Sequence, residues 1–292
     1  MSCSTCIQGV VHAGEPTGAT SNLHGKTCYV TPPLSSSTAS ASTIVYLSDT
    51  FGLNLVNAKL LADRLAAETG CRVLVPDVIP GGPAPLALMY AGDTRKADVP
   101  AWNLLGWLRL IWAEMTIVYL GARFKLWAAP QKAYTTSILP FVRAVRVELP
   151  PDAKLGVVGF CWGGWGSTNL CKEPRTEGSP EGLIDVQFCG HPYDLKTPEM
   201  IVDAVRTYKV PFSMAIGDND EWLKEEAVRE TQAALRQQLG SGDGEGGYNY
   251  EIQIYKGCTH GFIVRASPEN KVETSRAEDA RAQAIRWLNK YL

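Results

Sequence analysis

Short, continuously apolar runs that alternate with helix-like segments restrict the fold of this chain more than any other feature. Residues 43–47 (TIVYL) and 72–77 (RVLVPD) are predicted to be buried strands, and a helical stripe of valine and leucine between them ends at Gly70. Strands that are apolar at every position, instead of at every second one, are typical of a parallel sheet covered on both faces. The chain is therefore predicted to have an α/β fold.

The same alternation continues downstream. Further strands are predicted at residues 26–30, 154–160, 183–188, 210–216 and 250–255, and helices at residues 222–239 and from Ser275 onward. Ser275 and Glu278 form a capping box, and Asn54 is the expected N-cap of the helix that ends at Gly70. Residues 1–25 are predicted to be an N-terminal extension, and residues 26–292 a single domain without a linker or an internal repeat.

Composition excludes several classes of function. The 292 residues are 45% hydrophobic and 20% charged, which suits one large α/β domain. A net charge of −2 gives no electrostatic reason to expect a nucleic acid or a membrane as partner. The most apolar tract, residues 102–129, is interrupted by Arg109, Glu114, Arg123 and Lys125, so it is predicted to form buried or lid helices instead of a membrane span.

The eight cysteines show no spacing typical of a disulfide framework. No basic region followed by an apolar stretch is found at the N-terminus, so reduced thiols and a cytoplasmic location are expected. Cys3 and Cys6 form a CxxC pair, but no second pair follows, and no metal site is predicted.

The sharpest motif is residues 159–164 (GFCWGG), at the end of a predicted strand. Gly159 and Gly163 lie two residues before and two residues after Cys161, where small residues let a strand turn tightly into a helix with a strained nucleophile at the turn. The N-terminus of the following helix points at Cys161 and favours a thiolate. The alternative is a glycine turn that only packs a strand against a helix, although the dinucleotide-binding spacing G-x-G-x-x-G is absent.

Acidic and imidazole side chains follow the last two predicted strands. Asp218 and Asp220 come after residues 210–216, and His260 comes after residues 250–255. Taken singly, an aspartate here is usually a turn residue and one histidine says little. A nucleophile, an acid and a histidine in this chain order, each after a strand, are nevertheless typical of α/β-hydrolases. The sequence therefore predicts a Cys-His-Asp triad.

These motifs resemble the dienelactone hydrolase family, including its fungal branch. The resemblance begins near residue 10 and rests on residues 159–164, 217–220 (GDND), 260–262 (HGF) and 48–52 (SDTFG). It implies an α/β-hydrolase fold, with a mostly parallel central sheet flanked by helices and a helical lid-like insertion around residues 101–129. The implied activity is hydrolysis of enol-lactones such as dienelactone, without a cofactor.

The resemblance also implies roles for individual residues. Cys161 is the nucleophile, and His260 is the general base and then the acid. The family pattern G-x-x-D selects Asp220, and not Asp218, as the acid that orients the imidazole. The oxyanion hole uses the backbone N–H groups of Trp162 and Thr50.

Other side chains are expected near the substrate. Asp49 matches a family glutamate that helps to hold the resting thiol uncharged, and it is one methylene shorter. Arg265 is the counterpart of one of two arginines that bind the substrate carboxylate, although its spacing from the histidine is one residue longer; Arg123 is only a nearby candidate for the other. His191 recurs in fungal relatives and is expected either to face the pocket or to be structural.

Two kinds of activity are compatible with this site. The first is hydrolysis of a lactone, ester or thioester through an acyl-cysteine intermediate. The alternative is a non-hydrolytic cyclase or isomerase reaction, or a thioesterase-like step, in fungal secondary metabolism. A binding or redox-sensing protein is disfavoured because every triad position is filled. The expected partner is a small-molecule ester or lactone, the chain is a monomer or homodimer, and residues 101–129 form either a packed helical pair or a lid over a large apolar pocket.

Overall fold

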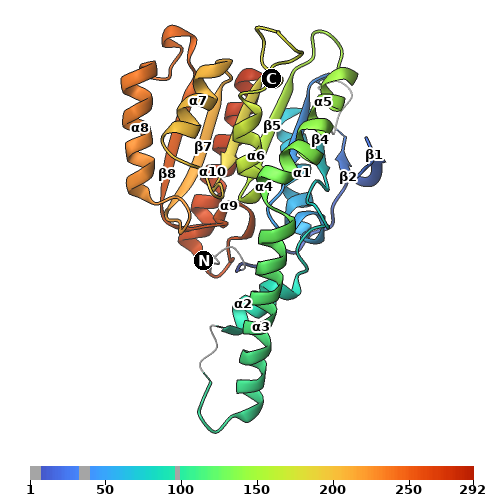
Figure 1. Cartoon of the computed structure of the whole chain (residues 1–292), viewed down its shortest axis with the longest axis vertical. Coiled ribbons are helices and arrows are strands. Elements are labelled where there is room, and N and C mark those ends of the chain that lie inside the picture. Colours follow the sequence, from blue (N-terminus) through green and yellow to red (C-terminus); the bar gives the residue numbers. More distant parts are fainter. Residues whose placement is uncertain (1–7, 33–39, 96–98) are drawn as a thin grey trace.

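A mostly parallel sheet organises the part of the chain that the computed structural model describes, residues 8–32, 40–95 and 99–292 (Figure 1). The sheet has eight strands in the order β1-β2-β4-β3-β5-β6-β7-β8. β1 and β2 run antiparallel to their neighbours, and the pairs from β4 to β8 are parallel. The strands are β1 (Ala19–Leu23), β2 (Lys26–Thr31), β3 (Thr43–Leu47), β4 (Arg72–Pro76), β5 (Leu155–Phe160), β6 (Val186–Gly190), β7 (Phe212–Asn219) and β8 (Tyr250–Thr259).

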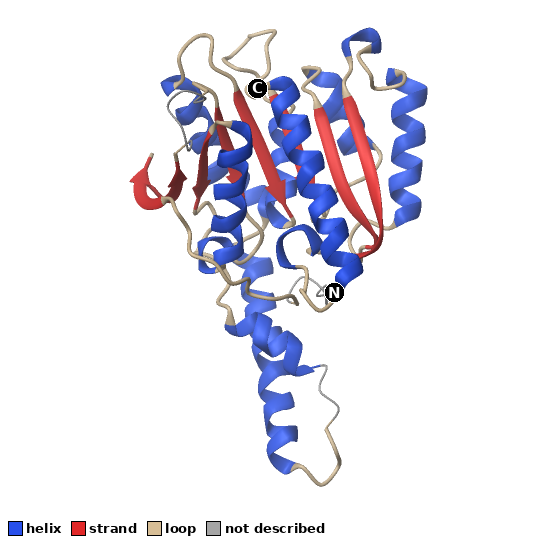
Figure 2. Ribbon diagram, turned by 180° about the vertical axis from the view of Figure 1, so that it is seen from behind, coloured by secondary structure: helices blue, strands red, loops and turns tan. Residues whose placement is uncertain are grey.

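Helices cover both faces of this sheet, as Figures 1 and 2 show from opposite sides. In β3, Ile44 and Tyr46 belong to one buried cluster together with side chains of α1 and α10, whereas Val45 and Leu47 belong to a second cluster with side chains of α5, α6 and α7. This arrangement confirms the interpretation of the continuous apolar strands. The helices are α1 (Val56–Thr69), α2 (Ala87–Arg95), α3 (Leu104–Trp127), α4 (Pro130–Ala133), α5 (Leu139–Glu148), α6 (Trp162–Leu170), α7 (Glu199–Thr207), α8 (Glu225–Leu239), α9 (Phe262–Arg265) and α10 (Lys271–Tyr291), with a π-helical turn at Tyr134–Ile138 and 3₁₀ turns at Gly52–Asn54 and Glu245–Gly247.

Helix starts are where the sequence-based predictions fail. The N-cap of α1 is Leu55, because Asn54 donates its side-chain N–H to the carbonyl of Ala84 instead; the helix does end at Gly70, at φ 69°. The capping box at Ser275 is wrong, since α10 begins four residues earlier and Asn270 accepts a hydrogen bond from the Glu273 N–H. At α1 the polar side chain thus binds a distant carbonyl, and at α10 an earlier residue, Asn270, is the cap.

Strand positions agree more closely with the predictions, except for β6 and for β1, which lies in the predicted extension and was not expected. Strand β6 was expected at residues 183–188 and lies at Val186–Gly190. Leu183 and Asp185 donate their N–H groups to the carbonyls of Glu173 and Leu155, so these residues form a connection and not a ladder with β7. The shift matters because the strand then ends beside the turn that carries Cys161.

The described part of the N-terminal segment is held against the rest of the fold. β1 pairs with β2 along the edge of the sheet. Nearer the start, the N–H of His12 and the carbonyl of Val10 bind the side-chain amide of Asn57 in α1. The division into an extension and a domain at residue 25 stays a prediction, and Cys3 and Cys6 lie outside the described residues.

Helices α2 and α3 form an arm that extends away from the sheet (Figures 1 and 2). The predicted helical insertion around residues 101–129 is confirmed, since α3 spans Leu104–Trp127. The expectation of burial holds only for its inner face, where Ala113 and Ile117 share a buried cluster with Leu88 of α2. Leu104 on the outer face is 73% exposed. Among the described residues, no helix combines the length and the apolar character needed to cross a bilayer.

Candidate active site

Cys161 lies in a strained turn between β5 and α6. Its backbone has φ 50° and ψ −113°, a region that residues with a side chain rarely occupy. The loop after β6 holds it there, because the Cys161 N–H donates to the Gly190 carbonyl (3.1 Å) and the Tyr193 N–H donates to the Cys161 carbonyl (2.9 Å). A Cβ on Gly159 would lie 2.5 Å from the Gly163 carbonyl oxygen. The elbow predicted from residues 159–164 is therefore present.

The start of α6 is in direct contact with the end of β3. The Gly163 N–H donates to the Ser48 carbonyl (3.1 Å), and a Cβ on Gly163 would lie 2.2 Å from the Leu47 carbonyl oxygen. This contact brings the loop that contains Thr50 next to Trp162, the first residue of α6. The role of their backbone N–H groups as an oxyanion hole stays a prediction.

His260 and Asp220 are brought together by the pairing of β7 and β8. The register pairs Asn219 with Thr259, so the next residue of each strand emerges at the same edge of the sheet. His260 Nδ1 lies 2.8 Å from Asp220 Oδ2, and both side chains are buried. The other oxygen of Asp220 accepts the N–H groups of Trp222 (2.8 Å) and Leu223. These bonds fix the carboxylate and explain why α8 begins at Glu225 and not at Trp222 as predicted.

Asp218 serves a different purpose. Its carboxylate accepts the N–H groups of Gly257 (2.8 Å) and Cys258 (3.2 Å) in β8. It therefore stabilises the strand pairing and does not contact His260. The aspartate in contact with the imidazole is the one that the G-x-x-D pattern selected.

Neighbouring charges raise the pKa of the His260 imidazole. Burial lowers its pKa, but the charges of Asp220 and Cys161 and the hydrogen bond to Asp220 outweigh this effect, and the pKa is raised well above its ordinary value. The thiol of Cys161 is thus close enough to His260 to raise the pKa of the imidazole, although the two residues are 99 positions apart. Asp220 holds Nδ1 of the ring, and the other ring nitrogen, Nε2, is buried without a hydrogen-bond partner among the described residues.

Asp49 and Arg265 form a buried ion pair beside these residues. Arg265 Nη1 contacts Asp49 Oδ2, and each side chain is 1% exposed. Arg265 also donates to the Gln8 carbonyl (3.0 Å) and lies over the ring of Phe51. Burial raises the pKa of the Asp49 carboxyl, the Arg265 charge lowers it, and the charge of Cys161 raises it again, so the net pKa is raised. The carboxyl is therefore near the nucleophile, as the resemblance implied.

His191 is the second buried imidazole at the site, and the sequence alone did not show whether it faces the pocket or is structural. Its ring packs between Phe160, Phe262 and His260, with 5.1 Å between the two imidazole centroids. Burial and then the charges of His260 and Arg265 lower its pKa well below the ordinary value, so the ring is neutral. Neither ring nitrogen has a hydrogen-bond partner among the described residues. His191 thus lies at the site and leaves two polar atoms for a small molecule or water.

Several contacts that hold the site have no signal in the sequence. Thr259, directly before His260, donates both its N–H and its hydroxyl to Glu273 of α10. The indole N–H of Trp162 donates to the carbonyl of Ala128, just after the arm (2.7 Å). The side chain of Arg123, the other arginine candidate, lies outside those described. No group of histidine, cysteine and acidic side chains in the described part of the chain is arranged to hold a metal ion.

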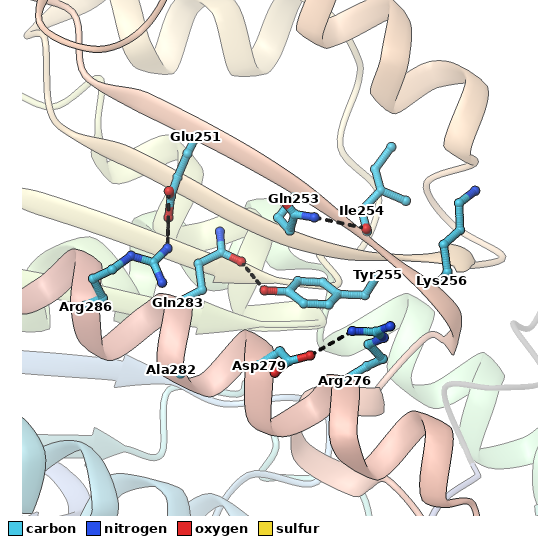
Figure 3. Close-up of a pocket in the computed structure, with 10 residues that line it drawn as sticks. All are labelled: Glu251, Gln253, Ile254, Tyr255, Lys256, Arg276, Asp279, Ala282, Gln283 and Arg286. Atoms are coloured by element: carbon cyan, nitrogen blue, oxygen red, sulfur yellow. Dashed lines mark hydrogen bonds and ion pairs between the residues drawn. The ribbon is translucent and has the colours of Figure 1, made fainter.

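A groove of ≈ 590 Å³ lies elsewhere, between β8 and α10 (Figure 3). Charged side chains such as Glu251, Lys256 and Arg276 line it, and none of Cys161, Asp220 and His260 does. Cys161 itself is 0% exposed. The chemistry of the buried residues, and not the groove, therefore identifies the candidate site.

Comparison with known proteins agrees with this geometry. The model of the dienelactone hydrolase family matches residues 28–292. The chain belongs to the dienelactone hydrolase family. It is thus a hydrolase of the ester and lactone type with an α/β-hydrolase fold.

The relatives include fungal proteins. The chain is similar to hydrolase pyvD of Aspergillus violaceofuscus, with 27% identity over 98% of this chain and 96% of that protein. Hydrolase tropI of Talaromyces stipitatus is 26% identical over 99% of this chain and 96% of its own length. Among solved structures, esterase 2 of Thermogutta terrifontis has a TM-score of 0.55, with 12% identity over 93% of this chain and 94% of that chain, a likeness of fold alone.

The elbow predicts that alanine substitutions at two glycines of β5 lower the free energy of unfolding by different amounts. Gly159→Ala should lower the free energy of unfolding by about 2 kcal/mol, because the new methyl group meets backbone and separates β5 from α6. Gly156→Ala is the control, since its methyl group meets the mobile end of Leu292 at 3.2 Å, and should cost less than about 1 kcal/mol. Urea denaturation measures both; equal losses would contradict this account of the elbow.

The buried ion pair predicts a change in pH dependence. Arg265→Met should cost about 3 kcal/mol at pH 7, because it leaves the Asp49 carboxylate buried without its partner. Asp49 would then bind a proton more tightly in the folded state than in the unfolded state. The stability of the variant should therefore be greatest below the ordinary carboxyl pKa and fall as the pH rises through the raised pKa.

Arg276→Met is the matched control, since the Arg276 pair with Asp279 is half exposed and should contribute less than about 1 kcal/mol. The free energy of unfolding is measured between pH 5 and pH 8. A flat difference between Arg265→Met and the wild type over this range would show that Asp49 does not depend on Arg265.

Proposed function

We propose that this protein hydrolyses a lactone, ester or thioester through an acyl-cysteine intermediate, with Cys161 as nucleophile, His260 as general base and acid, and Asp220 as the residue that orients His260. The observation that carries the proposal is the buried chain of contacts from the Cys161 thiol through His260 to Asp220, with the thiol held in a strained elbow. A base that faces a nucleophile and is itself held by a third group is the arrangement that covalent catalysis requires.

The proposed reaction has two halves. The Cys161 sulfur attacks the carbonyl carbon, its proton having passed to His260, and the backbone N–H groups of Trp162 and Thr50 stabilise the resulting oxyanion. The carbonyl re-forms as the C–O or C–S bond to the leaving group breaks, and His260 returns its proton to that group. Water, deprotonated by His260, then attacks the thioester, and the acid product leaves with the thiol restored.

The neighbouring charges favour an activated and uncharged acyl group. A thiolate attacks lactones, activated esters and thioesters readily and amides poorly. Arg265, the only arginine that the resemblance offered with a clear position, contacts Asp49 and is buried. A substrate carboxylate would have to compete with that pair or be buried without a cation, which costs several kcal/mol.

The triad predicts unequal effects for the two neighbouring aspartates. Asp220→Asn should lower kcat by about 10³–10⁴-fold, because the imidazole loses the partner that fixes its tautomer and stabilises its charged form. Asp218→Asn is the matched control and should cost less than about tenfold, since its contacts are with the backbone of β8. Steady-state hydrolysis of an aryl ester measures both, and the reverse ranking would move the acid to Asp218.

The nucleophile is tested by mass and by rate together. The wild type, mixed briefly with an activated ester, should gain the mass of one acyl group on the peptide that contains Cys161. Cys161→Ala should show neither that gain nor measurable turnover, while its far-UV circular dichroism stays unchanged. Cys189→Ala, at another buried thiol, controls for the loss of a cysteine and should keep both. More than a few per cent of activity in Cys161→Ala would refute the triad.

The substrate class is tested with Arg265→Met. If Arg265 serves mainly to hold Asp49, the variant should lose kcat/KM on dienelactone and on an uncharged aryl ester by similar factors, and the wild type should prefer the bulky aryl ester or lactone. Selective loss on dienelactone, together with dienelactone as the best substrate, would instead identify Arg265 as the carboxylate-binding residue.

The non-hydrolytic alternative is supported by the burial of the nucleophile. Cys161 is 0% exposed and His260 is 3% exposed, which restricts the access of water to an acyl-enzyme. A substrate that carries its own hydroxyl or carbon nucleophile would then release a cyclic product. Turnover in ¹⁸O-labelled water separates the two cases, since only hydrolysis places the label in the product acid.

A further inference from the structure

The outer face of the arm helix α3 is a continuous apolar surface. Ten large apolar side chains, from Leu104 to Leu126, are between 46% and 73% exposed among the described side chains of this helix. The largest apolar patch on an ordinary monomer covers roughly 300–600 Å². Ten aliphatic and aromatic side chains exposed to this extent present about 1,000 Å² of apolar surface to solvent. A surface of this size needs a partner.

The order of the exposed residues has the period of packed helices. Leu104, Leu108, Ile111, Met115, Val118 and Ala122 follow one another at alternating steps of four and three residues, and all are exposed. This spacing is the heptad seam by which one helix packs along another. Trp112 and Tyr119, each one position after a seam residue, widen the face, as is usual for a helix inside a bundle of more than two.

No element in the described part of the same chain covers this seam. The opposite side of α3, which includes Ala113 and Ile117, is the side buried with Leu88 and Met89 of α2. Figures 1 and 2 show the arm projecting from the body, with no other element alongside it. At 1.5 Å per residue, α3 is about 36 Å long, so the seam presents several turns to a partner.

We infer that the arm is a dimerisation element, and that its occupant is the arm of a second copy of this chain. Two α2–α3 hairpins joined through their seams place the two α3 helices against each other between the two α2 helices, related by a two-fold axis, so that the same face contacts itself. The exposed apolar area, about 1,000 Å² on each copy, exceeds the roughly 800 Å² per partner of a standard stable interface.

A second copy explains the face better than a lipid surface does. Helices that lie on membranes combine an apolar face with a polar face rich in lysine and arginine. Here the face opposite the seam packs on α2, and the whole chain has a net charge of −2, so attraction to anionic lipid is weak.

The experiment measures the mass of the full chain by sedimentation equilibrium over about 1–50 µM. The wild type should have twice the chain mass of 31.8 kDa. The variant Ile111→Glu/Met115→Glu should sediment as a monomer, because two carboxylates in the seam raise the dissociation constant by at least about 100-fold. The matched control, Val147→Glu/Val272→Glu, changes exposed valines of helices on the body and should remain dimeric.

Folding of the arm is checked separately. The seam variant should keep the far-UV circular dichroism and the ester hydrolysis of the wild type. A second variant, Leu108→Gln/Val118→Thr, adds no charge and should weaken the dimer by at least about tenfold. The inference is overturned if the wild type is monomeric throughout, or if both seam variants stay as dimeric as the control. Sedimentation of a monomeric wild type with phosphatidylcholine–phosphatidylserine vesicles, lost in the seam variants, would assign the face to a membrane instead.

Discussion

The backbone of Cys161 is in a conformation that it could not hold alone. A left-handed φ on a residue with a side chain is unfavourable, and three hydrogen bonds from two neighbouring strands and their loops offset that cost. These bonds require β3 and β6 to end level with β5, and they require glycine where α6 crosses the end of β3. The parallel sheet, the elbow and the nucleophile are thus one structural unit, and a change in strand register would remove the site together with the fold.

The pKa of each ionisable group around the thiol depends on several neighbouring charges and not on a single partner. Asp220 raises the pKa of the His260 imidazole, whereas burial lowers the pKa of the second imidazole, His191, whose ring centroid lies 5.1 Å away. Two adjacent cations in an apolar environment would repel each other, so a charge on His260 disfavours a charge on His191. The pKa of Asp49 likewise depends on two neighbours, since Arg265 lowers it and the charge of Cys161 raises it. Each ionisable group at the site therefore depends on the protonation state of at least one other.

The parts of the structure that follow from local sequence were predictable. The elbow needs only a strand, small residues and a nucleophile in sequence, and the order of Cys161, Asp220 and His260 is a property of the chain. Contacts between distant residues were not predictable. The partner of Arg265 is 216 positions away, and the distance along the sequence from His260 to Arg265 gave no sign that Asp49 would bind the arginine. The cap at Asn54 failed for a related reason, since its side chain binds Ala84, 30 residues away, which only the fold brings near. The apolar character of residues 102–129 was visible, but which face of α3 points outward depends on where α2 packs.

The N-terminal strap, residues 8–12, has a consequence for how the protein is made. The carbonyl of Gln8 and the N–H of Val10 bind Arg265, and His12 Nε2 bonds to the carbonyl of Ala266. A ribosome synthesises α9 more than 250 residues after the strap, at about 5–20 residues per second. During that time the strap can bind Asn57 of α1 but lacks Arg265 and Ala266, and β5 and α6 can form before β8 exists. The growing chain therefore carries its thiol for many seconds before the histidine and the arginine beside it have been translated, and the last contacts of the strap join two segments that are more than 250 residues apart in the sequence.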